Sequence, residues 1–359
     1  MSTISTDLTV NLFHTTLEKI QAAILNHPDM LVATLTSMTA GAVFGAALTA
    51  SMVYRPTVII SQMQMRDFHM LQVFLTASGT SAVVMLAFER LGISQRQVRP
   101  NSTLDWFSRY DANILGGALV GIGMSLSGAC PGTVIVQLAN GVRSGIYVAM
   151  GAVLGGVFHA KFGKPLAAYC QSPPNTTAET IGAKFNIDPM KVFLAFEVMC
   201  AGAVAATSLI TPKESYGWLH HVAGGLLIGC AQATSILLTN TPLCVSAAYE
   251  QIGRYIWRAL GQTGVAAPPS PPRGLAFAAG ILAGSAALAT LLPPAPIEAV
   301  QVSKLSAVIG GFVMLVGAGA AGGCTSGHGI SGLSSFSFSS LVTVAAMFSG
   351  GIITAILWT

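Results

Sequence analysis

Long uninterrupted apolar runs constrain this chain more than any other feature of its sequence. Each run is about 20 residues long, which is the length that an α-helix needs to cross a bilayer. Only 8% of the 359 residues are charged and 52% are hydrophobic, whereas a soluble protein carries about 25% charged residues. The runs are continuous rather than alternating, which favours helices over a membrane β-barrel. The sequence therefore predicts an all-α, polytopic helical membrane protein embedded in the lipid bilayer.

The apolar runs predict nine transmembrane helices with three shorter stretches between them. The predicted spans are residues 30–54, 68–88, 112–129, 144–160, 189–210, 219–239, 274–292, 303–323 and 337–359. The shorter stretches are residues 131–140, 241–260 and 324–335, and Gly or Pro interrupts each of them. Non-helical backbone at membrane depth survives only where protein or a water-lined path satisfies it, so we expect re-entrant or broken helices there.

Basic residues are divided unequally between the two sides that these spans define. Twelve lie on the side of the N-terminus, and five lie on the other side, namely Arg55, Arg66, Arg143, Lys213 and Lys304. Because cytoplasmic loops carry the excess of Lys and Arg, this predicts a cytoplasmic N-terminus in an integral protein of the cell membrane. The net charge of +4 is small and the basic residues are scattered, so we expect no nucleic-acid partner.

An internal repeat relates the two halves of the chain. Residues 112–130 read ANILGGALVGIGMSLSGAC and residues 306–324 read SAVIGGFVMLVGAGAAGGC, so four glycine pairs and the pair Cys130 and Cys324 coincide at one offset. A looser match joins the segments around Pro56 and Pro242. Glycine-rich membrane helices can match by chance because small residues serve close packing anywhere. The matched cysteines, each at the junction of a full span with a broken segment, favour a true repeat.

The repeat divides the chain into four parts. Residues 1–29 form a cytoplasmic N-terminal segment, residues 30–160 a first transmembrane repeat, residues 161–218 a connecting loop with a linking helix, and residues 219–359 a second repeat. The halves begin five spans apart, so they must have opposite orientations. Inverted, pseudo-symmetric repeats are typical of transporters, with the solute path at their interface.

The strings SGACPGT at residues 127–133 and GGCTSGHG at residues 322–329 carry the candidate chemistry. Their Gly, Pro and Ser residues break the helix, and free amides at the start of the next half-helix favour an anion. A thiol is a weak, polarizable donor that suits a sulfur-bearing anion. The candidate pathway residues are Gly128, Cys130, Pro131, Gly132, Thr133, Gln137, Gly322, Gly323, Cys324, Thr325, Ser326 and His328.

Two ionisable residues, His328 and Glu197, allow two interpretations each. His328 could offer a proton to an anion or face loop water. Glu197 lies in the middle of a predicted span, where an ionised group is costly, so it is a candidate for ion coupling or for a hydrogen bond to a neighbouring helix. We expect Cys170, Cys200 and Cys230 to be structural. The cysteines include no CxxC, so we expect no metal site, disulfide scaffold or cofactor.

These motifs together resemble the YeeE/YedE family of sulfur-compound membrane proteins. The resemblance depends on the glycine-rich spans that end in GAC and GGC, on QLANG at residues 137–141, on GHGISGLS at residues 327–334, and on PLCVSAAYEQIG at residues 242–253. It implies a thiosulfate transporter of hourglass-like fold whose lining cysteines pass the ion along by transient hydrogen bonds. It further implies that Cys130 and Cys324 are two of these cysteines, and that a cytoplasmic sulfur carrier or sulfurtransferase is a partner.

The sequence departs from the family pattern at one position. Members typically carry another cysteine soon after an Arg, in a string such as R-x-x-F-C, whereas residues 55–59 read RPTVI here. Cys244 occupies the related position in the second half. We expect Cys244 to lie on the pathway. That it substitutes for the missing thiol is a hypothesis, which the sequence leaves open.

Two other functions remain compatible with these residues. A membrane-embedded thiol enzyme would form a persulfide on Cys130 or Cys324, but such chemistry needs an activating base or cation, and His328 is the only candidate nearby in sequence. A permease for another small anion, such as a selenium compound, would use the same fold. The sequence contains no P-loop string, so we expect no ATPase. Transport without enzymatic activity is the favoured function.

Overall fold

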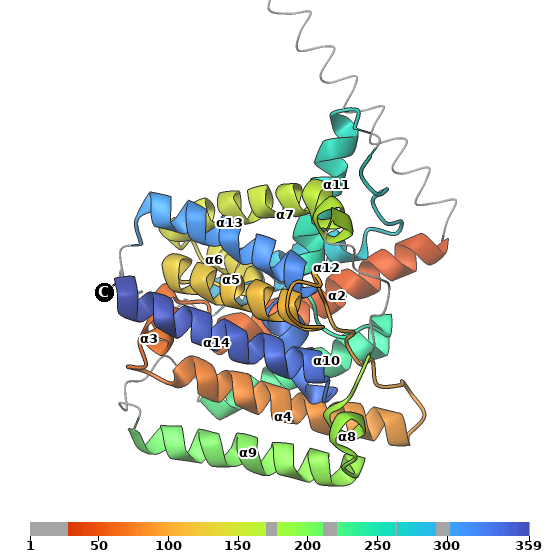
Figure 1. The fold of residues 1–359 in the computed structure, drawn as a ribbon, viewed down its shortest axis with the longest axis vertical. Helices are drawn as coiled ribbons and strands as arrows, with labels where there is room; N and C mark the ends of the chain where they lie inside the picture. Colours follow the sequence, from red (N-terminus) through yellow and green to blue (C-terminus); the bar gives the residue numbers. More distant parts are fainter. Residues whose placement is uncertain (1–27, 170–177, 211–220, 263, 292–301, 359) are drawn as a thin grey trace, which may run out of the picture.

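The structure is a computed structural model that describes residues 28–169, 178–210, 221–262, 264–291 and 302–358. Over these ranges the chain forms a bundle of helices and, apart from one isolated bridge between Thr180 and Ser337, no β-structure (Figure 1). The predicted all-α class is confirmed. Cys170 and nearly all of the predicted N-terminal segment lie outside the described residues.

Nine segments in the described ranges are long and apolar enough to cross a membrane, which confirms the predicted number. The linking helix α9 begins and ends at the predicted residues, and most other bounds differ by one to four residues. The prediction that the fourth span ends at residue 160 is wrong, because α7 continues to Tyr169. The long helices are α2 (Pro28–Ala50), α4 (His69–Arg90), α5 (Asp111–Ser127), α7 (Arg143–Tyr169), α9 (Pro189–Ile210), α10 (His221–Thr239), α12 (Arg273–Leu291), α13 (Lys304–Ala321) and α14 (Phe338–Trp358).

The three predicted broken segments correspond to the short elements α6 (Pro131–Ala139), α11 (Ser246–Ala259) and η1, a π-helix over Thr325–Gly332. Two further short helices are α3 (Pro56–Met63) and α8 (Ile181–Phe185). The prediction that the first span continues to residue 54 is wrong. Helix α2 ends at Ala50 because the chain turns there, with Met52 in the left-handed region (φ 59°), and Pro56 then starts α3.

The repeated glycines pack against one another across α5 and α13. A Cβ at Gly116 would come 2.6 Å from the Gly317 carbonyl oxygen, and a Cβ at Gly310 would come 2.9 Å from the Gly123 carbonyl oxygen. Only glycine permits so close a contact between backbones. Early glycines of one helix thus meet late glycines of the other, so α5 and α13 run antiparallel.

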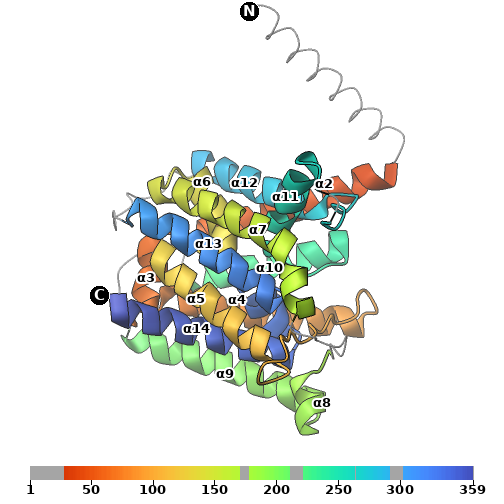
Figure 2. The same cartoon turned by 45° about the horizontal axis from the view of Figure 1, so that its top comes forward.

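Helix partners are exchanged between the two halves. Helix α2 of the first half packs along α12 of the second half, and α10 of the second half packs in the same way along α4 of the first. Likewise, α5 of the first half packs along α14, and α13 of the second half packs along α7 (Figure 2). The antiparallel pair α5 and α13 lies at the centre of this exchange. An inverted two-fold repeat predicts this arrangement.

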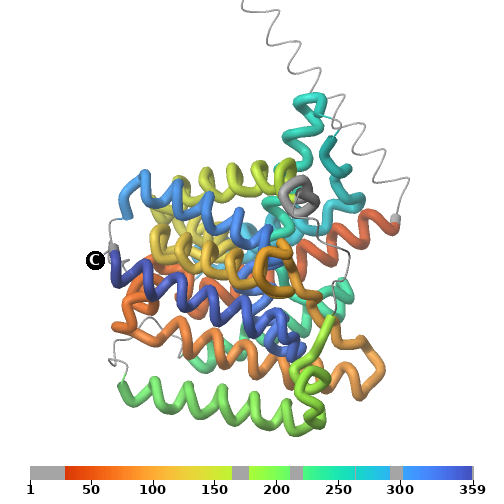
Figure 3. Tube along the Cα trace, in the orientation of Figure 1, coloured from red at the N-terminus to blue at the C-terminus, as the bar shows by residue number. Residues whose placement is uncertain are grey.

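Helix α9 stands outside the exchange, at the edge of the bundle beside α4 (Figure 1). Much of its apolar surface is uncovered, including Val198 (72% exposed) and Leu209 (86% exposed). Apolar side chains so exposed are suited to lipid. The short helices mark the two ends of the bundle: α3 lies at the end where α14 finishes, and α11 lies at the opposite end (Figures 1 and 3).

Candidate functional site

Both repeated cysteines lie where a long helix ends and a short one begins. Helix α5 ends at Gly128 (φ 63°) and α13 ends at Gly322 (φ 77°), both in the left-handed conformation that glycine adopts without steric cost. Two residues later, Cys130 and Cys324 have extended backbones and form the N-caps of α6 and η1. The sequence prediction of a helix break after each repeated span is confirmed.

The thiol of Cys130 is held by a reciprocal cap. The Thr133 amide donates to Cys130 Sγ at 3.5 Å, and the Cys130 amide donates to Thr133 Oγ1 at 2.7 Å. This exchange satisfies amides that would otherwise lack partners at the start of α6. Because the sulfur is the acceptor in this contact, its own S–H remains available to donate.

A cavity of about 60 Å³, here called the central cavity, separates the starts of α6 and η1. Its polar lining comes from Cys130 and Thr133 on one side and from Thr325 and Ser326 on the other. Within the described ranges, no charged side chain lines it. The rest of the wall is Gly132 and the apolar residues Phe44, Leu48, Val53, Ile59, Met70, Val73, Phe74, Ala77, Ile228 and Ile330. An anion here would be held by helix amides, hydroxyls and a thiol.

Cys324 connects the central cavity to a second thiol. It is fully buried (0% exposed), and its Sγ lies 3.2 Å from Ser326 Oγ. The thiol of Cys244 lies against η1, the helix that Cys324 caps, because a Cβ at Gly327 would come 3.0 Å from Cys244 Sγ. Cys244 in turn lines another cavity of about 140 Å³, here called the outer cavity, together with Ser246 and His159. Polar groups therefore follow one another from Cys130 through the central cavity to the outer cavity.

Several predicted site residues support the helix breaks rather than line a cavity. The amide of Gln137 donates to Tyr54 O at 2.8 Å and to Gly128 O at 2.9 Å, which joins α6 to the end of α5. Pro131 O accepts a hydrogen bond from the Tyr249 hydroxyl at 2.9 Å, which connects α6 to α11. Gly322 and Gly323 differ from these residues, because they line the outer cavity.

His328 uses both ring nitrogens within the protein. Its Nε2 lies 3.0 Å from Ala321 O and its Nδ1 lies 2.9 Å from Ser340 Oγ, and the residue is 1% exposed. The carbonyl partner requires Nε2 to donate, so in a neutral ring Nδ1 accepts from the serine. The ring faces neither loop water nor the central cavity, and it joins η1 to α13 and α14.

Glu197 lies apart from both cavities. A Cβ at Gly79 would come 3.0 Å from Glu197 Oε2, so the carboxylate lies between α9 and α4. Its Oε1 is buried and forms no hydrogen bond within the described part of the chain. Among the cysteines predicted to be structural, Cys200 is buried in α9 and Cys230 is exposed on α10.

One residue near the thiols, Arg99, belongs to none of the motifs in the sequence. The structure places Arg99 Nη1 3.0 Å from Gly322 O, beside the break that precedes Cys324. The basic residue lies in a connection between helices, and no local pattern indicates its distant partner. Only the scarcity of charge in this chain could have drawn attention to it.

Two broken helices that face each other across a buried cavity, each capped by a cysteine, define a class: a helical membrane transport protein. The sulphur transport family matches residues 50–353, and the chain belongs to this family. The family resemblance predicted from the motifs is confirmed.

Two relatives agree with this assignment. The "Thiosulfate transporter TsuA" of Spirochaeta thermophila is 24% identical over 344 residues, covering 85% of this chain and 93% of the relative. A Xylella fastidiosa protein named "Probable transporter" is 26% identical over 134 residues, covering 37% of this chain and 90% of the relative.

Proposed function

We propose that this protein carries thiosulfate, or a closely related small sulfur anion, across the cell membrane along its row of thiols and hydroxyls. The observation that carries the proposal is the central cavity, where the starts of two broken helices converge with Cys130 on one and Ser326 on the other. The relative named as a thiosulfate transporter supports the choice of solute.

The lining of the central cavity suits a soft anion that must leave again. The starts of α6 and η1 offer amides and positive dipole ends to the oxygens. The apolar walls accommodate the polarizable outer sulfur of thiosulfate, and a thiol donor such as Cys130 forms only a weak hydrogen bond with it. Weak contacts at successive sites permit conduction, whereas a fixed charge in the cavity would retain the ion.

Cys324 and Cys244 continue the row on the other side of the central cavity. In this proposal the anion moves from Ser326 to the paired thiols and then enters the outer cavity. Cys244 substitutes for the thiol that the family carries near Ile59. The antiparallel packing of α5 and α13 supports the division into inverted repeats at residues 30–160 and 219–359.

The charge distribution of the loops gives the proposed orientation of the protein in the membrane. With a cytoplasmic N-terminus, the end of the bundle where α4 connects to α5 faces the cytoplasm. Helix α11, which contributes Ser246 and Glu250 to the outer cavity, lies at the same end (Figure 3). The outer cavity therefore belongs to the cytoplasmic side in this proposal. A cytoplasmic sulfur carrier or sulfurtransferase would then receive the anion there. Attaching a reporter to the C-terminus tests the orientation, since the proposal places that end outside the cell.

Uptake of labelled thiosulfate into liposomes that contain only the purified protein tests the function. We expect saturable uptake that unlabelled thiosulfate inhibits and that exceeds leakage into protein-free liposomes. Sulfate and selenate, added as competitors, measure whether the outer sulfur is required. Uptake no faster than leakage under several ion gradients would overturn the proposal.

A further inference from the structure

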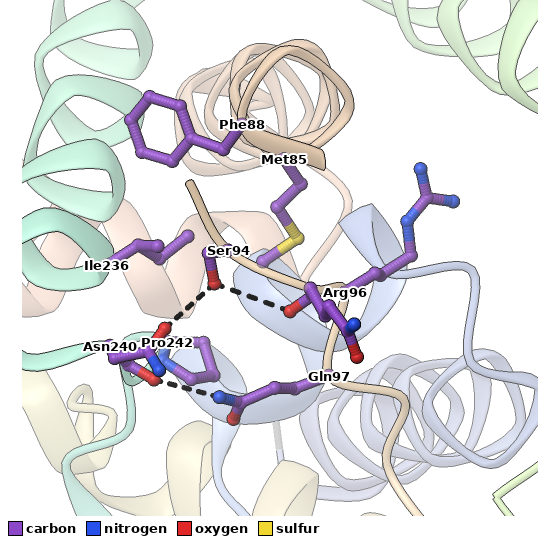
Figure 4. A pocket seen from close by; sticks show the side chains of 9 residues that line it. Met85, Phe88, Ser94, Arg96, Gln97, Ile236, Asn240 and Pro242 are labelled. Carbon is purple, nitrogen blue, oxygen red and sulfur yellow. Dashed lines mark hydrogen bonds between the residues drawn. The ribbon is translucent and has the colours of Figure 1, made fainter. Parts of the chain in front are cut away.

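The connection between α4 and α5 carries Arg99, and it is bound to the connection between α10 and α11, which carries Cys244. Ser94 Oγ donates to Asn240 Oδ1 at 2.9 Å, and the Gln97 amide donates to Asn240 O at 2.8 Å (Figure 4). The cavity beside these bonds measures about 10 Å³ and has room for no more than a water molecule. These bonds therefore fix the two connections relative to each other.

Arg99 itself is held at both ends. Its carbonyl oxygen accepts hydrogen bonds from Ser337 Oγ at 2.8 Å and from Ser339 Oγ at 3.0 Å, near the start of α14. Its guanidinium donates through Nη1 to Gly322 O at 3.0 Å. A long side chain that is fixed in this way loses little further rotamer freedom when it binds a ligand.

Two glycines provide the space that the guanidinium occupies. A Cβ at Gly323 would come 2.8 Å from Arg99 Nη1. A Cβ at Gly327 would come 2.9 Å from Arg99 Nη2 and 3.0 Å from Cys244 Sγ. The string GGCTSGHG thus does more than break a helix, because its glycines let an arginine and a thiol meet at η1.

The guanidinium keeps binding capacity for an anion. Its Nε is buried without a hydrogen-bond partner, and within the described ranges no carboxylate forms an ion pair with it. Glu250, which lines the outer cavity, pairs instead with Arg254. Besides Gly322 O, the guanidinium has the thiol of Cys244 as a neighbour, because both lie about 3 Å from the same Cβ position at Gly327.

We propose that Arg99 binds the transported anion where it passes from the paired thiols to the outer cavity, and that this charge selects oxyanions over neutral solutes. This inference rests on the proposed function. A guanidinium can hold two oxygens of a sulfur oxyanion through parallel hydrogen bonds, while Cys244 meets the outer sulfur. No charged residue in the described part of the chain lines the central cavity, so the charge of Arg99 acts on the anion only after it has left that cavity.

Kinetics of thiosulfate uptake by proteoliposomes test the inference. We expect Arg99→Gln to raise KM about tenfold or more, since a hydrogen bond to a charged group contributes about that factor. Arg99→Lys keeps the positive charge but cannot form two parallel hydrogen bonds, so its KM should lie between that of the wild type and that of Arg99→Gln. Arg109→Gln is the matched control, because it removes a charge from the same connection at a residue that is 58% exposed. An unchanged KM in Arg99→Gln would overturn the inference about Arg99. It would leave the proposed function intact as long as the wild-type protein shows saturable uptake.

Modification of Cys244 gives a readout that does not require transport. A negatively charged methanethiosulfonate reagent should modify Cys244 faster than a positively charged one in the wild type, as followed by peptide mass spectrometry. Arg99→Gln should abolish or reverse this preference, and Arg109→Gln should retain it. Equal rates for both reagents in the wild type would refute the role of Arg99 whether or not the protein transports thiosulfate.

Discussion

Cys244 and Cys324 meet at the same short helix, although they belong to different connections of the second half: Cys324 caps η1, and a Cβ at Gly327 of η1 would come 3.0 Å from Cys244 Sγ. Cys130 lies on the other side of the central cavity, with Ser326 between it and this pair. The first half thus contributes one thiol to the row and the second half contributes two. In the proposed pathway, Cys244 takes the place of the thiol that the family pattern has near Ile59 and that this chain lacks.

Removal of either repeat cysteine tests the row directly. We expect Cys130→Ala and Cys324→Ala each to abolish or severely reduce thiosulfate uptake, because each deletes a donor next to the central cavity. Folding should survive, since loss of the cap at Cys130 costs only about 1 kcal/mol. Uptake by proteoliposomes measures the first effect and thermal unfolding measures the second.

Cys230→Ala is the matched control for these variants, because Cys230 is exposed on α10 and lines neither cavity. It should transport like the wild type. A protein that lacks both Cys130 and Cys324 and still supports normal growth on thiosulfate as the sole sulfur source would show that the thiols are not required.

Cys244→Ala tests whether this thiol replaces the missing one. We expect uptake to fall at least severalfold, because the anion would lose the thiol donor that lines the outer cavity. Cys244→Ser should retain part of the activity through its hydroxyl. Wild-type uptake in Cys244→Ala would confine the pathway to Cys130 and Cys324.

The glycine contacts between α5 and α13 predict a packing effect independent of the thiols. Gly116→Leu or Gly310→Leu should lower the thermal unfolding temperature in detergent and reduce the yield of folded protein. A side chain forced against a facing backbone costs about 1–3 kcal/mol or more. Gly202→Leu is the control, because nothing lies within 4 Å of a Cβ at that residue of α9. Equal stability of Gly116→Leu and Gly202→Leu would contradict the antiparallel glycine contact.

The sequence sufficed for the long helices and for the breaks because both signals are local. A run of about 20 apolar residues is the length that crosses a bilayer. A glycine in the left-handed conformation, such as Gly322, ends one helix, and a proline such as Pro131 starts the next. Helix α3 was not predicted, because its local signal is weak: its eight residues are largely apolar and follow the first span so closely that no separate helix is indicated. The match between Pro56 and Pro242 was the signal that could have revealed it.

The composition of the site was less predictable than its location. Cys130 and Cys324 are visible in the repeat, but the position of Cys244 against η1 depends on how two distant connections pack. The same holds for Arg99, whose partner Gly322 lies far along the chain. His328 shows the converse, since a histidine in a glycine-rich string suggested proton chemistry, and the structure gives both of its nitrogens partners within the protein.

Serine substitutions separate transport by transient contact from covalent sulfur transfer. A serine at residue 130 or 324 keeps a hydrogen-bond donor but shortens its reach and loses the softness of sulfur. Partial uptake is therefore expected from Cys130→Ser and Cys324→Ser if the row acts by hydrogen bonding. A covalent mechanism would lose its nucleophile, and the same variants would be inactive.

The companion measurement is intact-protein mass spectrometry after incubation with thiosulfate under non-reducing conditions. Hydrogen bonding leaves the mass unchanged, because each contact breaks before the next one forms. We therefore expect no added sulfur on Cys130 or Cys324 in wild-type protein that is actively transporting. A stoichiometric gain of one sulfur atom on either residue, appearing at the rate of turnover, would instead assign the protein a thiol chemistry in which the row of cysteines forms persulfides.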